Sequence, residues 1–421
     1  MYLFSTLIVY NFFYLKGRGK AQKSVPETPF ARMGGSMEAI VGIICEYDPF
    51  HRGHRRQFDL IRAQLPGARI VCAMSGPFTQ RGMPALHSPA DRARAALEAG
   101  ADLVLELPCA FAVRDAEHFA LGGISILTRL GFVTHLSFGA EDGLDALMPA
   151  AALLDAPTPA FQEALRAALA RGASFAAAQG EALAACLPAP RPAPWEKPNN
   201  ILALCYLRAL RRLESPLIPL PVRREGDYHA AALEGRRWPS ATAVRAAFLG
   251  GDLAAARAAC GYDLPAAPVC RPEALDRVLL YKLRAQNAEA LARLPDCTEG
   301  LENRLKACAA RAATREELLS LLKTRRYAYA RLSRLCCHAL LDVTAGLLAA
   351  HPLPTYARLL GLRRGALNGE LRQSALPLPA RAAELNPDDP LAALDLRAYD
   401  LWALGAGLAQ GMLQRQKVCV L

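Results

Sequence analysis

Residues 38–54 read EAIVGIICEYDPFHRGH. The first part, Glu38–Cys45, is a run of apolar and β-branched residues, which is typical of a strand buried on both faces of a parallel sheet. A helical pattern follows from Gly53 to about Leu65. The polar segment between the two predicts a tight turn from a buried strand into the first turn of a helix.

The same alternation of strand and helix continues along the chain. Further strands are predicted at Arg69–Met74, Asp102–Leu107 and Thr134–Phe138, with helices at Ser88–Gly100 and Asp115–Leu130. Such alternation predicts an α/β fold with a doubly wound parallel sheet. Ligand sites in these sheets lie at the carboxyl ends of the strands, which here precede residues 46–54, 75–82, 107–114 and 139–143.

The sequence H-x-G-H at His51–His54 is the strongest chemical signal. At a helix start, unpaired backbone N–H groups and the positive end of the helix dipole bind phosphate, and Gly53 allows close approach. Imidazoles one turn apart can donate hydrogen bonds to oxygens that become more negative during attack on an α-phosphate. Taken alone, the same two histidines could instead bind a metal or cap the helix.

A second candidate element begins at Ser240. Ser240 and Thr242 place hydroxyl groups at the start of a predicted helix, and Arg245 follows one turn later, a pattern suited to β- and γ-phosphates. The alternative is an ordinary N-cap followed by a solvated arginine.

Length and composition limit the number of domains and the kinds of partner that the chain can have. A chain of 421 residues suggests two or three domains, and 50 basic against 39 acidic residues give a net charge of +11, which favours a polyanionic partner such as RNA. A GC-rich genome, which encodes arginine often, would give the same positive charge. The 12 cysteines show no disulfide or zinc spacing, so no metal site is predicted and a reducing cytoplasm is expected.

The two ends of the chain differ from the middle. The apolar run Tyr2–Leu15 is too short for a membrane span and lacks the charge order of a signal peptide, so residues 1–36 are interpreted as a disordered extension or a mispredicted start. After Pro272 nearly everything is predicted helical to about Gly346, followed by an irregular tail.

One basic stretch of this helical part combines cations with tyrosines, as RNA-binding surfaces do. The cations are Lys323, Arg325, Arg326, Arg331 and Arg334. A stretch of this kind is more often an ordinary solvated helix face.

Several motifs occur in order: GIICEYDPFHRGH at 42–54, MSGPFTQRG at 74–82, DLVLELP at 102–108, SFGAE at 137–141, KPNNIL at 197–202 and EGLENR at 299–304. In these motifs the chain resembles the bacterial tRNA(Met) cytidine acetate ligases, over roughly residues 38–365. The resemblance implies a nucleotidyltransferase Rossmann-like ATP-binding domain at 37–260 and a mostly α-helical tRNA-binding domain at 261–421.

The resemblance also implies a reaction and a site. Acetate and ATP would form acetyl-adenylate, and the acetyl group would pass to the wobble cytidine of elongator tRNA(Met), giving N(4)-acetylcytidine; Mg²⁺ is expected with ATP. His51 and His54 would be catalytic. The ATP site would comprise Ile44, Cys45, Glu46, Tyr47, Asp48, Pro49, Phe50, His51, Arg52, Gly53, His54, Arg55, Arg56, Gln57, Gly139, Asn199 or Asn200, and Arg223 or Arg224, with Ser240, Thr242 and Arg245.

The chain departs from the family pattern at two places. Asp48 stands where the family usually has Asn, so its negative charge near phosphates requires a cation or a hydrogen bond. Pro89 replaces a common Lys, whose charge Arg81 or Arg92 would have to supply.

Glu106, at the end of a predicted strand, is either a substrate-positioning carboxylate or a structural one.

Two other functions remain possible from the sequence. A small-molecule adenylyltransferase of coenzyme biosynthesis would use the same phosphate site, but it would not need the helical second half. A catalytically silent RNA-binding protein would keep the fold as a scaffold, although the intact histidines disfavour this reading.

Overall fold

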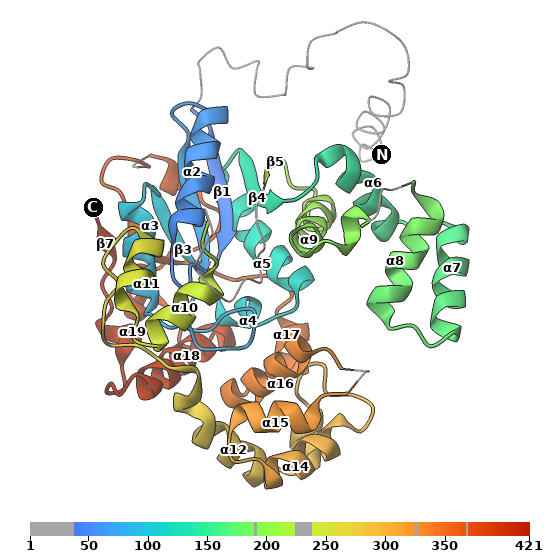
Figure 1. Ribbon diagram of the computed structural model, residues 1–421. Coiled ribbons are helices and arrows are strands. Elements are labelled where there is room, and N and C mark those ends of the chain that lie inside the picture. Colours follow the sequence, from blue (N-terminus) through green and yellow to red (C-terminus); the bar gives the residue numbers. More distant parts are fainter. Residues whose placement is uncertain (1–37, 189–191, 224–237, 325–326, 368) are drawn as a thin grey trace, which may run out of the picture. The chain divides into compact units, whose positions relative to one another are not determined.

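A seven-stranded sheet has the strand order β5-β4-β1-β2-β3-β6-β7 (Figure 1). Its strands are β1 (Ile40–Cys45), β2 (Arg69–Ser75), β3 (Leu103–Leu107), β4 (His135–Ala140), β5 (Ile218–Arg223), β6 (Arg358–Leu362) and β7 (Cys419–Val420). Strands β1 to β5 pair in parallel, and the order reverses between β1 and β4. The predicted doubly wound sheet is therefore confirmed, with its topological switch point beside the H-x-G-H turn.

The computed structural model describes residues 38–188, 192–223, 238–324, 327–367 and 369–421. The predicted extension at residues 1–36 lies outside this range. Among the described residues, no helix is long and apolar enough to cross a membrane.

Helices connect the strands and make up most of the second half. They are α2 (Arg52–Gln64), α3 (Pro89–Glu98), α4 (Cys109–Ala112), α5 (Ala116–Arg129), α6 (Leu144–Asp155), α7 (Pro159–Ala170), α8 (Phe175–Cys186), α9 (Pro198–Arg212), α10 (Ala241–Leu249), α11 (Leu253–Cys260), α12 (Asp276–Ala285), α13 (Ala288–Ala292), α14 (Leu301–Arg311), α15 (Arg315–Leu322), α16 (Tyr329–Leu341), α17 (Ala345–Ala350), α18 (Pro390–Gly405) and α19 (Met412–Arg415).

The central strands are buried on both faces, as their continuous apolar sequence predicts. In β1, Val41 and Ile43 pack with the apolar sides of α2 and α3, whereas Ile40 and Ile44 pack with α5 and α9 on the opposite face (Figure 1). Close approach of α5 depends on glycine, because a Cβ at Gly123 would lie 2.5 Å from the side chain of Ile44. The rigid core fixes the carboxyl end of β1 and the start of α2.

The expectation of an irregular tail after Gly346 was wrong. Strand β6 pairs antiparallel with β3, and β7 pairs with β6 at the sheet edge. Helix α18 buries Trp402, whose indole N–H donates to the main-chain oxygen of Ala85 at 2.6 Å. The prediction failed because β6 and β7 are short and are held by pairing with distant strands, so the proline-containing sequence of the tail shows little hydrophobic periodicity. The boundary at residue 260 stays a prediction, although β6 and β7 lie beyond it and belong to the sheet.

Candidate active site

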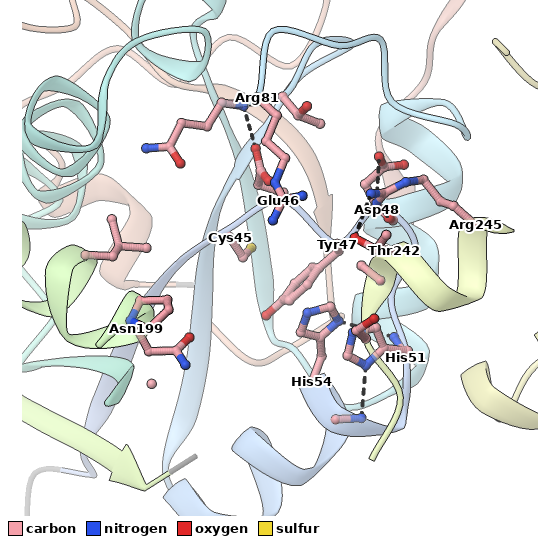
Figure 2. A pocket seen from close by; sticks show the side chains of 18 of the residues that line it. Cys45, Glu46, Tyr47, Asp48, His51, His54, Arg81, Asn199, Thr242 and Arg245 are labelled. Carbon is pink, nitrogen blue, oxygen red and sulfur yellow. Dashed lines mark hydrogen bonds and ion pairs between the residues drawn. The ribbon is translucent and has the colours of Figure 1, made fainter. Parts of the chain in front are cut away.

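A cavity of about 820 Å³ opens at the switch point of the sheet. Its walls come from the ends of β1, β4 and β5, the loop after β2, and the first turns of α2, α9 and α10 (Figure 2). The cavity also reaches α15 and α16 of the helical half. The turn that the sequence singled out therefore lies against a space large enough for a nucleotide.

His51 and His54 face each other in this cavity, with their rings stacked at a centroid distance of 3.7 Å and an interplanar angle of 21° (Figure 2). Nδ1 of His51 accepts a hydrogen bond from the backbone N–H of Gly53 at 3.1 Å. Nδ1 of His54 accepts one from the backbone N–H of His51 at 3.3 Å. The pair is therefore a reciprocal cap of α2 as well as part of the cavity wall.

These hydrogen bonds decide which nitrogen carries the proton. Because Nδ1 of each neutral ring is an acceptor, the proton lies on Nε2, and each ring presents an Nε2–H donor. Gly53 is required by the same arrangement, since a Cβ there would lie 2.9 Å from Cε1 of His51. The absence of a side chain at Gly53 thus makes room for the His51 ring and also leaves the backbone accessible to a ligand.

Asp48 is paired with Arg245, as its charge requires. Oδ1 of Asp48 accepts from the backbone N–H of Leu86 at 2.8 Å, and Oδ2 lies 3.4 Å from Nη1 of Arg245. Arg245 also donates to the main-chain oxygen of Asp48 and, at 3.3 Å, to the hydroxyl of Thr242 (Figure 2). Ser240 caps α10 by accepting from the N–H of Ala243 at 3.0 Å, and it lines the cavity too.

The loops after β1 and β2 are joined by Arg92. Its buried guanidinium donates to the main-chain oxygens of Glu46, Gly76 and His87. Arg92 is therefore engaged in holding loops and does not line the cavity, whereas Arg81 does.

Glu46 lies beside Arg81 in the cavity wall (Figure 2). Its Oε1 accepts from the backbone N–H of Gln80 at 2.6 Å. Burial raises the pKa of Glu46, and the Gln80 hydrogen bond and Arg81 oppose that rise. The loop after β2 is thus tied directly to the end of β1.

The two asparagines differ in position. Asn199 lines the cavity, and its Nδ2 donates to Oε1 of Glu141 at 2.7 Å. Asn200 is fully buried, where Oδ1 accepts from the N–H of Glu141 at 2.8 Å and Nδ2 donates to Asp142 at 2.6 Å. Asn200 therefore stabilises the loop after β4.

Most of the other predicted ATP-site residues also line the cavity: Ile44, Cys45, Tyr47, Arg56, Gln57, Gly139 and Arg223. Those that do not line it are Pro49, Phe50, Arg52, Arg55 and Asn200. Phe50 is in the core and Arg55 pairs at the surface with Asp59 at 3.8 Å. Arg224 lies outside the described residues.

Some lining residues were missed from the sequence. Trp238 lies 4.6 Å below the guanidinium of Arg56, measured to the ring centroid. Arg315 and Glu316 come from α15. A lone Trp-Pro pair and a charged helix start give no pattern that would distinguish them from ordinary surface residues.

Glu106 is a structural carboxylate. It is buried, it does not line the cavity, and its Oε2 accepts from Nε of Arg358 at 2.7 Å. Arg358 also donates to the hydroxyl of Tyr399, so this pair joins β3, β6 and α18.

Two of the predicted RNA-binding cations also make hydrogen bonds within the protein. Lys323 donates to the main-chain oxygens of Thr324 and Tyr327 at 3.1 and 2.7 Å, and Arg331 donates to that of Asp296 at 2.7 Å. Burial lowers the pKa of Arg334. Arg325 and Arg326 lie outside the described residues.

Comparison with known proteins gives consistent results. The family model described as HIGH Nucleotidyl Transferase matches residues 37–416. Proteins named tRNA(Met) cytidine acetate ligase are similar to this chain: that of Geobacillus sp. (strain WCH70) is 34% identical, covering 83% of this chain and 90% of the relative. That of Bacillus subtilis (strain 168) is 33% identical, covering 86% and 92%.

Solved structures agree. Thermotoga maritima TmcAL in its apo form superposes with a TM-score of 0.79 at 25% identity, covering 91% of this chain and 99% of that chain. The same protein bound with alpha-thio ATP gives a TM-score of 0.77 at 25% identity, covering 90% and 96%. The chain therefore belongs to the HIGH nucleotidyltransferases and, among them, to the tRNA(Met) cytidine acetate ligase family.

Proposed function

We propose that this protein is an ATP-dependent ligase that acetylates N4 of the wobble cytidine of elongator tRNA(Met). The observation that carries the proposal is the stacked His51–His54 pair, which lines a cavity at the switch point of the sheet. The coenzyme adenylyltransferase is not favoured, because the named relatives cover more than four-fifths of the chain, including its helical half.

In the first step, a carboxylate oxygen of acetate attacks the α-phosphorus of ATP, and the bond to pyrophosphate breaks. The amino end of α2 and the imidazole Nε2–H groups stabilise the negative charge that develops on the phosphate oxygens. Arg56, Arg223 and Arg245 line the same cavity and supply positive charge for the leaving pyrophosphate. No covalent enzyme intermediate is required.

In the second step, the exocyclic N4 of cytidine attacks the acetyl carbonyl of acetyl-adenylate. The C–O bond to AMP breaks, N4 loses a proton, and the products are N(4)-acetylcytidine and AMP. Acetyl-adenylate forms in the nucleotide cavity, and cytidine N4 must approach its acetyl carbon there. The tRNA base must therefore reach the same cavity.

We assign the contacts with ATP to Asn199 and Arg223, because both line the cavity. The domain at 261–421, with Lys323, Arg325, Arg326, Arg331 and Arg334, is proposed to bind tRNA. A cytoplasmic location fits these substrates and the unpaired state of all 12 cysteines.

Magnesium is expected to accompany ATP. The described residues contain no group of three or more His, Cys, Asp or Glu side chains placed to hold a metal ion. Asp48, an acidic residue of the proposed phosphate site, is already engaged by Leu86 and Arg245. The described residues therefore offer no dedicated ligand set for the metal.

The test is an exchange assay with the full chain. Labelled pyrophosphate should enter ATP only when acetate is present, and nucleoside mass analysis of tRNA(Met) after incubation with ATP and acetate should show N(4)-acetylcytidine. Exchange that depends on a different acceptor would favour the adenylyltransferase. The absence of any exchange would favour the silent RNA-binding protein.

A further inference from the structure

Part of the cavity wall belongs to neither the phosphate site nor the sheet. It is formed by Thr79, Gln80 and Arg81 of the loop after β2, and by Arg315, Glu316, Tyr329 and Ser333 of α15 and α16. The proposed phosphate-binding arginines come from other elements. This wall, which we call the helical wall, brings uncharged polar, basic, acidic and aromatic groups to the same cavity as the proposed reaction centre.

The helical wall is fixed by close backbone contact. Gly82 has a φ of +70°, and a Cβ there would lie 2.6 Å from the main-chain oxygen of Ser333. The hydroxyl of Ser333 donates to the main-chain oxygen of Arg81, and Arg315 donates to that of Gly82 at 3.3 Å. The loop and the helices therefore hold one another in place.

Within the helical wall, Tyr329 lines the cavity and is 46% exposed, so part of its side chain is accessible to a ligand. Its hydroxyl donates to Oε2 of Glu316 at 2.8 Å. Partial burial and this hydrogen bond raise the pKa of Tyr329, so the hydroxyl stays a donor at neutral pH. The ring is thereby oriented by a carboxylate on the neighbouring helix.

We propose that the helical wall receives the cytidine base of the tRNA, with Tyr329 stacking on the base and Glu316 accepting a hydrogen bond from N4. This inference rests on the proposed function. Aromatic side chains are the usual platforms for unstacked bases in RNA recognition, and a carboxylate matches the donor amine of cytosine. Glu316 can hold Tyr329 through one oxygen and orient N4 toward the acetyl group through the other.

The experiment compares two partial reactions in the full chain: acetate-dependent pyrophosphate exchange and acetyl transfer to tRNA(Met). In Tyr329→Ala the ratio of transfer to exchange should fall roughly tenfold, since stacking of one base on an aromatic ring has about this value. Tyr329→Phe keeps the ring and should lower the ratio roughly twofold. Glu316→Ala should also lower the ratio, because it removes both the acceptor for N4 and the carboxylate that orients Tyr329.

Tyr281 gives the matched control, because it is 72% exposed on α12 and does not line the cavity. Tyr281→Ala should leave the ratio unchanged. The inference is overturned if Tyr329→Ala and Glu316→Ala both behave like Tyr281→Ala, or if Tyr329→Phe loses as much as Tyr329→Ala. Failure of the proposed function is a different result, namely no acetate-dependent exchange in the unmodified protein.

Discussion

Arg245 and Asp48 are 197 positions apart in the sequence, yet Nη1 of Arg245 lies 3.4 Å from Oδ2 of Asp48 at the wall of the nucleotide cavity. The same arginine donates to the main-chain oxygen of Asp48. The ion pair explains how a carboxylate is accommodated beside the proposed phosphate site. It also predicts that Asp48 competes with phosphate for Arg245.

Asp48→Asn should therefore improve ATP binding. The amide keeps an oxygen for the N–H of Leu86 and releases Arg245, so the KM for ATP in the exchange assay should fall roughly threefold, the value of a modest ion pair. Asp59→Asn removes an equal charge from the exposed face of α2 and is the control. A higher KM in Asp48→Asn would mean that the carboxylate itself assists binding.

His51→Asn separates helix capping from catalysis. Asn is a good N-cap and preserves an acceptor for the first turn of α2, but it removes the imidazole Nε2–H. The rate of exchange should fall roughly 100- to 1000-fold, the usual effect of losing one donor to a developing charge. Thermal unfolding should stay close to that of the unmodified protein. Retained exchange would refute the assignment of His51.

Removing positive charge from the proposed tRNA-binding surface should make the affinity for tRNA less dependent on salt concentration. The double variant Lys323→Gln with Arg331→Gln should flatten the slope of log Kd against log salt for tRNA by roughly 1.5, because each phosphate contact contributes about 0.7 to 0.9. Arg166→Gln with Arg171→Gln, on α7 and just after it, gives the same charge change elsewhere. Equal slopes in the two double variants would remove this surface from consideration.

The buried ion pair of Glu106 and Arg358 should contribute to the stability of the fold and not to catalysis. Arg358→Met leaves a buried carboxylate unpaired and should destabilise the fold by about 3 to 5 kcal/mol. Adding Glu106→Gln removes that charge and should restore most of the loss in denaturant unfolding. If the double variant is stable but inactive in the exchange assay, Glu106 has a role beyond stability.

The loss of folding stability at acid pH should depend in part on His338. Burial lowers the pKa of His338 from 6.5 to about 4, while its Nε2 donates to the main-chain oxygen of Val113 at 2.8 Å. The neutral ring therefore stabilises the fold fully above pH 6.5, and this contribution is lost as pH falls toward 4. His338→Gln keeps the donor and cannot titrate.

Between pH 7.5 and 5, the stability of His338→Gln relative to the unmodified protein should rise by about 2 kcal/mol. Urea unfolding at the two pH values measures this difference. Parallel pH profiles would show that His338 does not control the acid response.

The local features of the site were readable from the sequence because they depend on neighbours in the chain. A β-branched apolar run predicts β1, and a spacing of three residues brings His51, the N-cap of α2, next to His54 in its first turn. The tail was misread because β6 is stabilised by pairing with β3, more than 250 positions earlier, and its own five residues carry little pattern.

The order of strands and helices through β5, the turn predicted to bind phosphate and the family were readable from the sequence itself, since hydrophobic periodicity and motif spacing are local properties. Only the tertiary structure decided that Asn199 faces the cavity while Asn200 is buried, because adjacent helix positions point about 100° apart and packing selects between them. It also decided which cations lie at the nucleotide cavity, because hydrogen bonds to main-chain oxygens hold Arg92 in the interior, whereas Arg56 and Arg223 line the cavity wall.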